Sequence, residues 1–127
     1  MVIFDTNMIL RYLLNDNQLM ADQAEKYLDA GEVSVTVEVI AEVVYVLHGV
    51  YSMERGIIAD TLKKFLNIVD CRDKKVLDQA LDTFGKRKLD FVDCVLYGYH
   101  QVRGAEIATF DRKLQRLLVK GAAAGQS

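Results

Sequence analysis

Short apolar runs alternate along this chain with stretches in which apolar residues recur every three or four positions. The runs are rich in β-branched or aromatic residues, which predicts buried strands at residues 2–5, 33–36, 68–71, 106–110 and 117–119. The spaced stretches predict helices at residues 8–14, 18–30, 37–48, 53–66, 74–84 and 91–102, with a short helix starting near Asp111. This alternation favours an α/β domain in which helices cover both faces of a parallel sheet.

One boundary in this pattern depends on length. Residues 33–47 read VSVTVEVIAEVVYVL and are almost continuously apolar. A single strand of that length would span ~50 Å, which is too long for a small domain. We therefore expect a strand at 33–36 and then a helix, with Thr36 as its N-cap and Glu38 in its first turn.

The size and composition indicate one globular domain. The chain has 127 residues, of which 51% are hydrophobic and 27% charged, and such a chain buries enough surface to fold without disulfides or metals. We expect a single domain over residues 1–120 and a disordered tail, GAAAGQS, at 121–127. The apolar runs are too short for a membrane helix, and no basic leader precedes the first one. Two widely spaced cysteines, Cys71 and Cys94, fit free thiols in a reducing, cytoplasmic setting.

Composition also excludes several kinds of site. With two histidines and three serines, the chain is poor material for a Ser-His-Asp triad or a histidine-rich zinc site, and it lacks the glycine-rich nucleotide motifs. The net charge of −2 argues against a generally basic nucleic-acid binder. Residues 1–62 carry three basic and ten acidic side chains, whereas residues 63–127 carry thirteen basic and eight acidic ones. This asymmetry permits a local basic face.

Carboxylates concentrate where strands are predicted to end. Asp5 ends the first run, Asp111 follows the 106–110 run, and Asp90 and Asp93 open the helix before it. Glu42 lies in the apolar segment IAEVVYVL, where we expect burial, and a buried glutamate needs a partner. Because ligands of α/β sheets bind beyond the carboxyl ends of strands, these acids are expected in one cleft. Oxygen ligands suit Mg²⁺ or Mn²⁺.

Each of these acids also fits a purely structural role. Asp5, Asp90 and Asp111 all stand where a helix N-cap is expected. Glu42, together with Glu38 four residues earlier, fits the solvent-facing stripe of an amphipathic helix. Only the conjunction of the acids favours a metal site.

Three blocks of sequence, in this order, resemble a known family. They are VIFDTNMIL, AEVVYVL and DCVLYGYHQVRGAEIATFD. Together they resemble the PIN domain, and more closely the VapC-type ribonuclease toxins of toxin–antitoxin pairs, over residues 2 to about 119. The resemblance implies a three-layer α/β/α sandwich with a central parallel sheet of about four or five strands.

The resemblance also assigns roles to individual residues. It implies that four acids hold a catalytic Mg²⁺ or Mn²⁺, namely Asp5, Glu42, Asp93 and Asp111. Asp90, one turn before Asp93, is left open as a substitute for it or as a more distant ligand. Polar residues matching those that orient the acids are Thr6, Asn7 and Thr109. Basic residues flanking the acids are expected to contact RNA phosphates, and these are Lys86, Arg87, Lys88, Arg112, Lys113 and Arg116.

The resemblance implies that this protein is a metal-dependent endoribonuclease. It is expected to pair with a VapB-like antitoxin and to form a homodimer through helix faces away from the cleft. Two alternatives keep the same acids: a structure-specific DNA nuclease, and an inactive PIN domain that only binds RNA or protein. An unrelated phosphotransferase ranks last, because DTN after the first strand lacks the paired acids such enzymes need.

Overall fold

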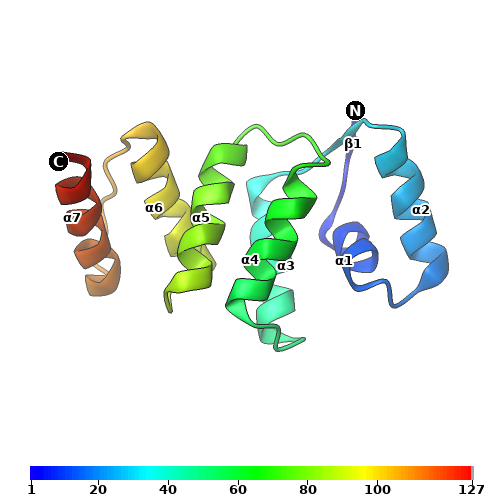
Figure 1. The fold of residues 1–127 in the computed structure, drawn as a ribbon, viewed down its shortest axis with the longest axis horizontal. Coiled ribbons are helices and arrows are strands. Elements are labelled where there is room, and N and C mark those ends of the chain that lie inside the picture. Colours follow the sequence, from blue (N-terminus) through cyan, green and yellow to red (C-terminus); the bar gives the residue numbers. More distant parts are fainter. Residues whose placement is uncertain (127) are drawn as a thin grey trace.

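Two short parallel strands lie along one edge of a row of helices in the computed structural model of the protein (Figure 1). The structure describes the backbone of residues 1–126 and the side chains of residues 1–120. The strands are β1 (Val2–Ile3) and β2 (Val33–Ser34). The helices are α1 (Thr6–Leu14), α2 (Gln18–Asp29), α3 (Val37–Gly49), α4 (Arg55–Leu66), α5 (Lys74–Lys86), α6 (Phe91–Arg103) and α7 (Arg112–Gln126).

The strands pair in parallel, as the alternation of elements predicts. Val2 lies opposite Val33 and Ile3 opposite Ser34. The amide of Phe4 donates to the carbonyl of Ser34 at 3.1 Å. On the other side of β2, the predicted strand 68–71 is reduced to one parallel bridge between Ser34 and Asp70. The carboxyl ends of β1 and β2 therefore lead directly into α1 and α3 at the same edge.

Local capping chemistry sets most helix ends close to their predicted positions. The Asp5 carboxylate accepts from the amide of Met8 at 2.9 Å, and Thr36 Oγ1 accepts from the amide of Val39 at 3.3 Å. Gly31, just beyond α2, has φ +79°, a left-handed conformation that glycine adopts without strain. These helix starts and stops are therefore determined by neighbouring residues, which is why the sequence alone predicted them.

The core forms between the apolar stripes of the helices. In α3 the buried residues are Ile40, Val43, Val44 and Leu47, at the spacing of one helix face. Helix α5 lies between α4 and α6 (Figure 1). Contact with α6 is especially close at Gly98, where an added Cβ would meet the carbonyl oxygen of Val76 at 2.8 Å.

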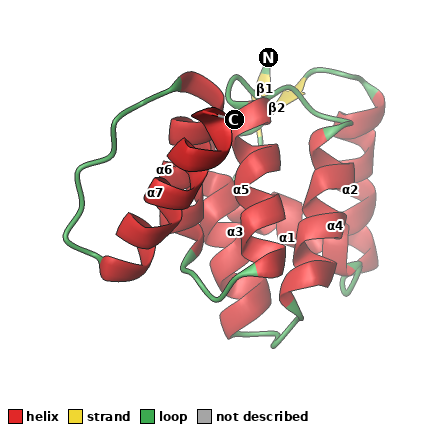
Figure 2. Ribbon diagram, turned by 60° about the vertical axis from the view of Figure 1, so that its left-hand side comes forward, coloured by secondary structure: helices red, strands yellow, loops and turns green. Residues whose placement is uncertain are grey.

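The sheet is smaller than predicted, and the four- or five-stranded α/β/α sandwich is not found in residues 1–126. The predicted strand 106–110 is an unpaired connection that passes around the outside between α6 and α7 (Figure 2). Its Phe110 side chain is fully exposed. A β-branched pattern becomes a strand only where another strand meets it, and here the packing of α7 on α6 fixes both ends of the segment away from β1.

The predicted strand 117–119 is helical. Leu114 and Leu117 are both buried, three residues apart, so this segment follows the helical rather than the strand period. Helix α7 continues to Gln126, which also corrects the expectation of a disordered tail for its backbone; Ser127 and the side chains of 121–127 lie outside the described residues. No helix in the described part of the chain is both long and apolar enough to cross a membrane.

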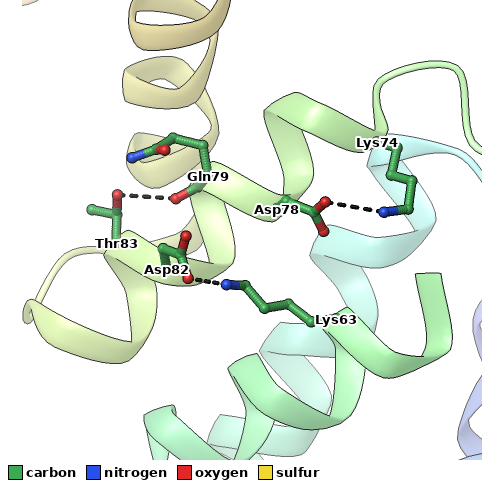
Figure 3. Close-up of polar contacts among 6 residues, drawn as sticks. All are labelled: Lys63, Lys74, Asp78, Gln79, Asp82 and Thr83. Atoms are coloured by element: carbon green, nitrogen blue, oxygen red, sulfur yellow. Dashed lines mark hydrogen bonds and ion pairs between the residues drawn. The ribbon is translucent and has the colours of Figure 1, made fainter. Parts of the chain in front are cut away.

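Ion pairs occupy part of the basic surface in the second half of the chain (Figure 3). Lys63 of α4 pairs with Asp82 of α5, and Lys74 pairs with Asp78 one turn later at 3.1 Å. Such exposed pairs contribute little to stability, roughly 0–1 kcal/mol each. Their lysines are already neutralised by neighbours, which separates them from the unpaired cations described below.

The close approach at Gly98 gives the first prediction. Gly98→Ala should lower the free energy of unfolding by about 1–3 kcal/mol, because the backbone carbonyl of Val76 cannot move away without separating α5 from α6. Urea denaturation measures this. Gly56→Ala on α4 is the matched control, since no atom lies within 4 Å of its added Cβ, and it should stabilise the helix by up to about 1 kcal/mol. Equal effects of the two changes would contradict the prediction.

Candidate functional site

The start of α6 is held in place by a single arginine from α4. Arg55 Nη1 donates to the carbonyl oxygens of Arg87 and Leu89, both at 2.8 Å, and of Phe84 at 3.3 Å. The guanidinium carbon also lies 4.2 Å from the centroid of the Phe84 ring, in a cation–π contact. Arg55 therefore fixes the connection between α5 and α6, and this connection carries the basic and acidic residues of the site.

Asp90 and Asp93 stand on the first turn of α6. Asp90 occupies the N-cap position, but its side chain makes no capping hydrogen bond, and it is exposed. Asp93 is half-buried one turn later. Burial raises the pKa of the Asp93 carboxyl, and the negative charges of Asp111 and Asp90 raise it further. These three residues, which we call the acid cluster (Asp90, Asp93 and Asp111), are thus close enough for their charges to act on one another.

Asp111 reaches the acid cluster from the start of α7. Its Oδ1 accepts from the amide of Leu114 at 2.8 Å, so it also caps this helix. Thr109 supports it: Thr109 Oγ1 accepts from the Asp111 amide at 3.0 Å, and the Thr109 carbonyl accepts from Gln115 Nε2 at 2.7 Å. The resemblance gives Thr109 a role in orienting an acid, and here its hydroxyl accepts from the backbone amide of Asp111.

The first predicted acid stands at the start of α1. Asp5 is exposed and caps α1 through the bond to Met8, which is the structural role that the sequence left open for it. Its neighbours Thr6 and Asn7 form the first turn of α1.

The burial expected of Glu42 is wrong. Glu42 is exposed on α3, on the side of the helix away from Val43 and Val44. The apolar residues around it in sequence point into the core, and the glutamate faces solvent, as in the amphipathic alternative. Its presence in an apolar segment therefore needs no buried partner.

The acids of the described residues do not form a complete set of metal ligands. Among the described residues, no three His, Cys, Asp or Glu side chains lie close enough together to hold a metal ion. The donor chemistry of the acid cluster nevertheless fits a hard divalent cation, because all donors are carboxylate oxygens. Burial raises the pKa of Asp93, and the negative charges of Asp111 and Asp90, which a cation would offset, raise it further. Mg²⁺ usually takes one or two carboxylates and keeps several waters, so two donors suffice.

A basic pocket adjoins the acid cluster. It has a volume of about 290 Å³ and is lined, besides Leu89 and Leu117, by five cations: Arg87, Lys88, Lys113, Arg116 and Lys120. None of the five forms an ion pair with a described residue. Arg87 and Lys88 directly precede Asp90, and Lys113 follows Asp111 by two residues, so the same two chain segments supply both the cations and the acids.

Sequence reasoning named four of these five cations and missed Lys120. Its place one helical turn after Arg116 on α7 became visible only once residues 117–119 proved to be helical. The predicted contacts Lys86 and Arg112 are exposed but do not line the pocket. Arg55 was missed too; no sequence signal links it to carbonyls that lie 29 to 34 residues away.

The thiols and imidazoles offer no rival chemistry. Burial raises the pKa of the Cys94 thiol to about 12, so it is not a nucleophile at neutral pH. His100 Nδ1 bonds the carbonyl of Ala105 at 2.9 Å, and His48 Nδ1 bonds that of Met53 at 3.3 Å. Both imidazoles therefore make structural contacts with backbone carbonyls.

A comparison with protein-family models identifies the family of this chain. The PIN domain model matches residues 2–119, which is nearly the whole chain. The chain belongs to the PIN domain family. PIN domains are α/β proteins and generally nucleases, and they typically use divalent metal ions. Neither the curated proteins nor the solved structures gave a match to the chain.

The hold of Arg55 on the α5–α6 connection can be tested directly. Arg55→Met keeps much of the side-chain volume but removes every donor, so three carbonyl oxygens lose a charged partner. The free energy of unfolding should fall by about 3 kcal/mol in urea denaturation. Arg55→Lys should lose less, since it keeps one cationic donor.

Arg72→Met is the control for this prediction, because Arg72 is exposed and makes no hydrogen bond with a described residue. It should change stability by less than about 0.5 kcal/mol. A loss no larger in Arg55→Met than in Arg72→Met would show that Arg55 does not hold the connection.

Proposed function

We propose that this PIN domain is a metal-dependent endoribonuclease, and that it is the toxin of a VapBC-type toxin–antitoxin pair. The observation that carries the proposal is the acid cluster beside a pocket of five unpaired cations. An enzyme that cuts a polyanion needs both parts. Its cations hold the phosphates, and its carboxylates bind a metal where the phosphate to be cut lies.

The acid cluster supplies the chemistry in this proposal. Asp93, with Asp90 or Asp111, would hold Mg²⁺ or Mn²⁺. When bound, the ion supplies a water of lowered pKa and neutralises charge on the phosphate. The negative charges of Asp111 and Asp90 add to burial in raising the pKa of Asp93, and a bound cation would offset those charges. Asp5 and Glu42 match acids of the family, and their participation requires that α1 and α3 present them to the same metal.

The basic pocket supplies binding. Arg87 and Lys88 extend from a connection that Arg55 makes rigid, whereas Lys113, Arg116 and Lys120 follow one side of α7. Such a pocket holds successive phosphates of the strand and carries no sequence information itself. It favours nucleic acid over a small substrate, and RNA is the substrate that the VapC resemblance implies.

Two partners belong to the proposal through the same resemblance. A VapB-like antitoxin would cover the acid cluster, near which the apolar side chains of Val92 and Phe110 are exposed. A homodimer would form through helix faces away from the cluster. Sedimentation of the protein alone and with its antitoxin measures both.

Cleavage should depend on Asp93 more than on Asp90. With Mn²⁺ present, the wild type should cut single-stranded RNA, and Asp93→Asn should reduce the rate at least ~100-fold, because it removes a carboxylate that the metal needs. Asp90→Asn should retain measurable activity. Asp93→Asn should not lower stability at neutral pH: a raised pKa in the folded state means that ionised Asp93 disfavours folding there.

Wild type and variants are compared on RNA and on DNA of the same sequence, with and without Mn²⁺, and cut ends are mapped. Faster cutting of DNA would identify the DNA nuclease alternative. Absence of cleavage together with absence of Mn²⁺ binding in calorimetry would identify the inactive PIN domain. Loss of activity in Asp90→Asn but not in Asp93→Asn would reverse the assignment of the third acid.

Binding through the basic pocket should be visible in its salt dependence. Replacing both Lys113 and Arg116 by Gln removes two phosphate contacts, so the slope of log affinity against log salt should become shallower by about 1.4 for single-stranded RNA. Fluorescence anisotropy without divalent metal measures the slope. Lys75→Gln on the exposed side of α5 is the control and should leave it unchanged. Equal slopes for all three proteins would remove this pocket from the binding surface.

A further inference from the structure

A second pocket opens between α3 and α6, next to the acid cluster. It has a volume of about 570 Å³, within the range of small-molecule sites. We call it the α3–α6 pocket and define it by the residues that give it chemistry: Tyr45, His48, Arg55, Phe84, Asp90 and Asp93. Asp90 and Asp93 belong to the acid cluster as well, so whatever enters this pocket adjoins the proposed reaction centre.

The pocket presents planar groups. The ring of His48 meets Phe84 edge to face, with centroids 5.6 Å apart, and the Arg55 guanidinium lies over the same Phe84 ring. Phe91, also in the lining, packs on Phe84 at 5.7 Å. Four rings, those of Tyr45, His48, Phe84 and Phe91, therefore line the pocket among aliphatic and charged side chains, and Phe84 contacts two of the others.

Tyr45 is the side chain that these contacts leave free. It is 73% exposed, and it makes no hydrogen bond or aromatic contact with a described residue. Tyr45 therefore buries little of its surface, although it lies on a helix whose other face is apolar. An exposed aromatic ring in the lining of this pocket is a stacking surface that no described residue of the chain occupies.

Hydrogen-bonding groups accompany the planar ones. Because His48 Nδ1 donates to the Met53 carbonyl, Nε2 remains as the acceptor of a neutral ring. Arg55 uses only Nη1 for its three carbonyls, so other guanidinium N–H groups have no described acceptor. Asp90 and Asp93 add carboxylate acceptors at the rim. The pocket thus offers both donors and acceptors beside apolar, planar walls.

We infer that the α3–α6 pocket binds one unpaired nucleobase of the RNA strand, stacked on Tyr45, next to the phosphate that the acid cluster receives. This inference rests on the proposed function. A base has two flat apolar faces and a hydrogen-bonding edge, and this combination matches the pocket. A base inside a duplex cannot leave its stack without cost, so the pocket selects single-stranded RNA and favours particular bases beside the cut.

Binding without cleavage tests the pocket. Fluorescence anisotropy in EDTA compares the full-length wild type with Tyr45→Ala and Tyr45→Phe on a single-stranded RNA, on the same RNA with one abasic position, and on its duplex. Tyr45→Ala should weaken single-strand binding about 5- to 150-fold, the equivalent of ~1–3 kcal/mol for one stacked base. Tyr45→Phe should restore most of it, since the ring remains.

The abasic RNA gives the sharper result. The abasic position is moved along the strand. At one place the wild type should lose as much affinity as the Tyr45→Ala change costs on the intact RNA. At that same place the Tyr45→Ala variant should bind the abasic RNA as well as it binds the intact RNA. Tyr27→Ala is the control, because Tyr27 is 47% exposed on α2, at the far end of the row of helices from α6 and α7 (Figure 1). Circular dichroism confirms that each variant folds.

Three results would overturn the inference: equal effects of Tyr45→Ala and Tyr27→Ala, additive losses at every abasic position, or no binding of single-stranded RNA by the wild type. Cleavage with Mn²⁺ separates this outcome from the proposed function. Cleavage whose rate and base preference Tyr45→Ala leaves unchanged removes the pocket but keeps the nuclease. Tyr45-dependent binding without any cleavage keeps the pocket and removes the nuclease.

Discussion

The guanidinium of Arg55 is the contact on which the proposed site depends. It joins α4 to the end of α5 and the start of α6 by bonding three carbonyl oxygens and lying on Phe84. Charged donors to otherwise unpaired carbonyls are among the stronger hydrogen bonds in proteins. Because this connection carries Arg87, Lys88 and Asp90, one side chain positions part of the basic pocket, the acid cluster and a wall of the α3–α6 pocket.

Opposite charges lie side by side around this connection. Burial and then the negative charges of Asp111 and Asp90 raise the pKa of Asp93, while the cations of the basic pocket have no acidic partners among the described residues. In a structure made only for stability, these two sets would pair with each other, as Lys63 and Asp82 do on α4 and α5. Because they do not pair, the acids can bind a metal while the cations bind the phosphates of a polyanion. Pairing would neutralise both sets before either ligand arrived.

Local sequence was a good guide to the helices and a poor one to the sheet. Caps such as Asp5 and Thr36 act on amides three residues away, so their effect can be read directly from the chain. The strand-like segment 106–110 has the composition of a strand, but pairing needs a neighbour that composition cannot supply. Residues 117–119 show a second reason why sequence can mislead. A short apolar run fits the spacing of a helix as well as that of a strand, and the burial of Leu114, three residues before Leu117, shows that this run is helical.

By itself the sequence determined the helices, most of their caps, the family, and the excess of cations in the second half of the chain. All of these depend on residue type and on spacing of a few positions. Only the tertiary structure decided that Glu42 faces solvent, that Arg55 anchors the start of α6, and that Tyr45 stands free beside a pocket. Those outcomes depend on which helix faces meet, and this is set by the packing of segments that are far apart along the chain.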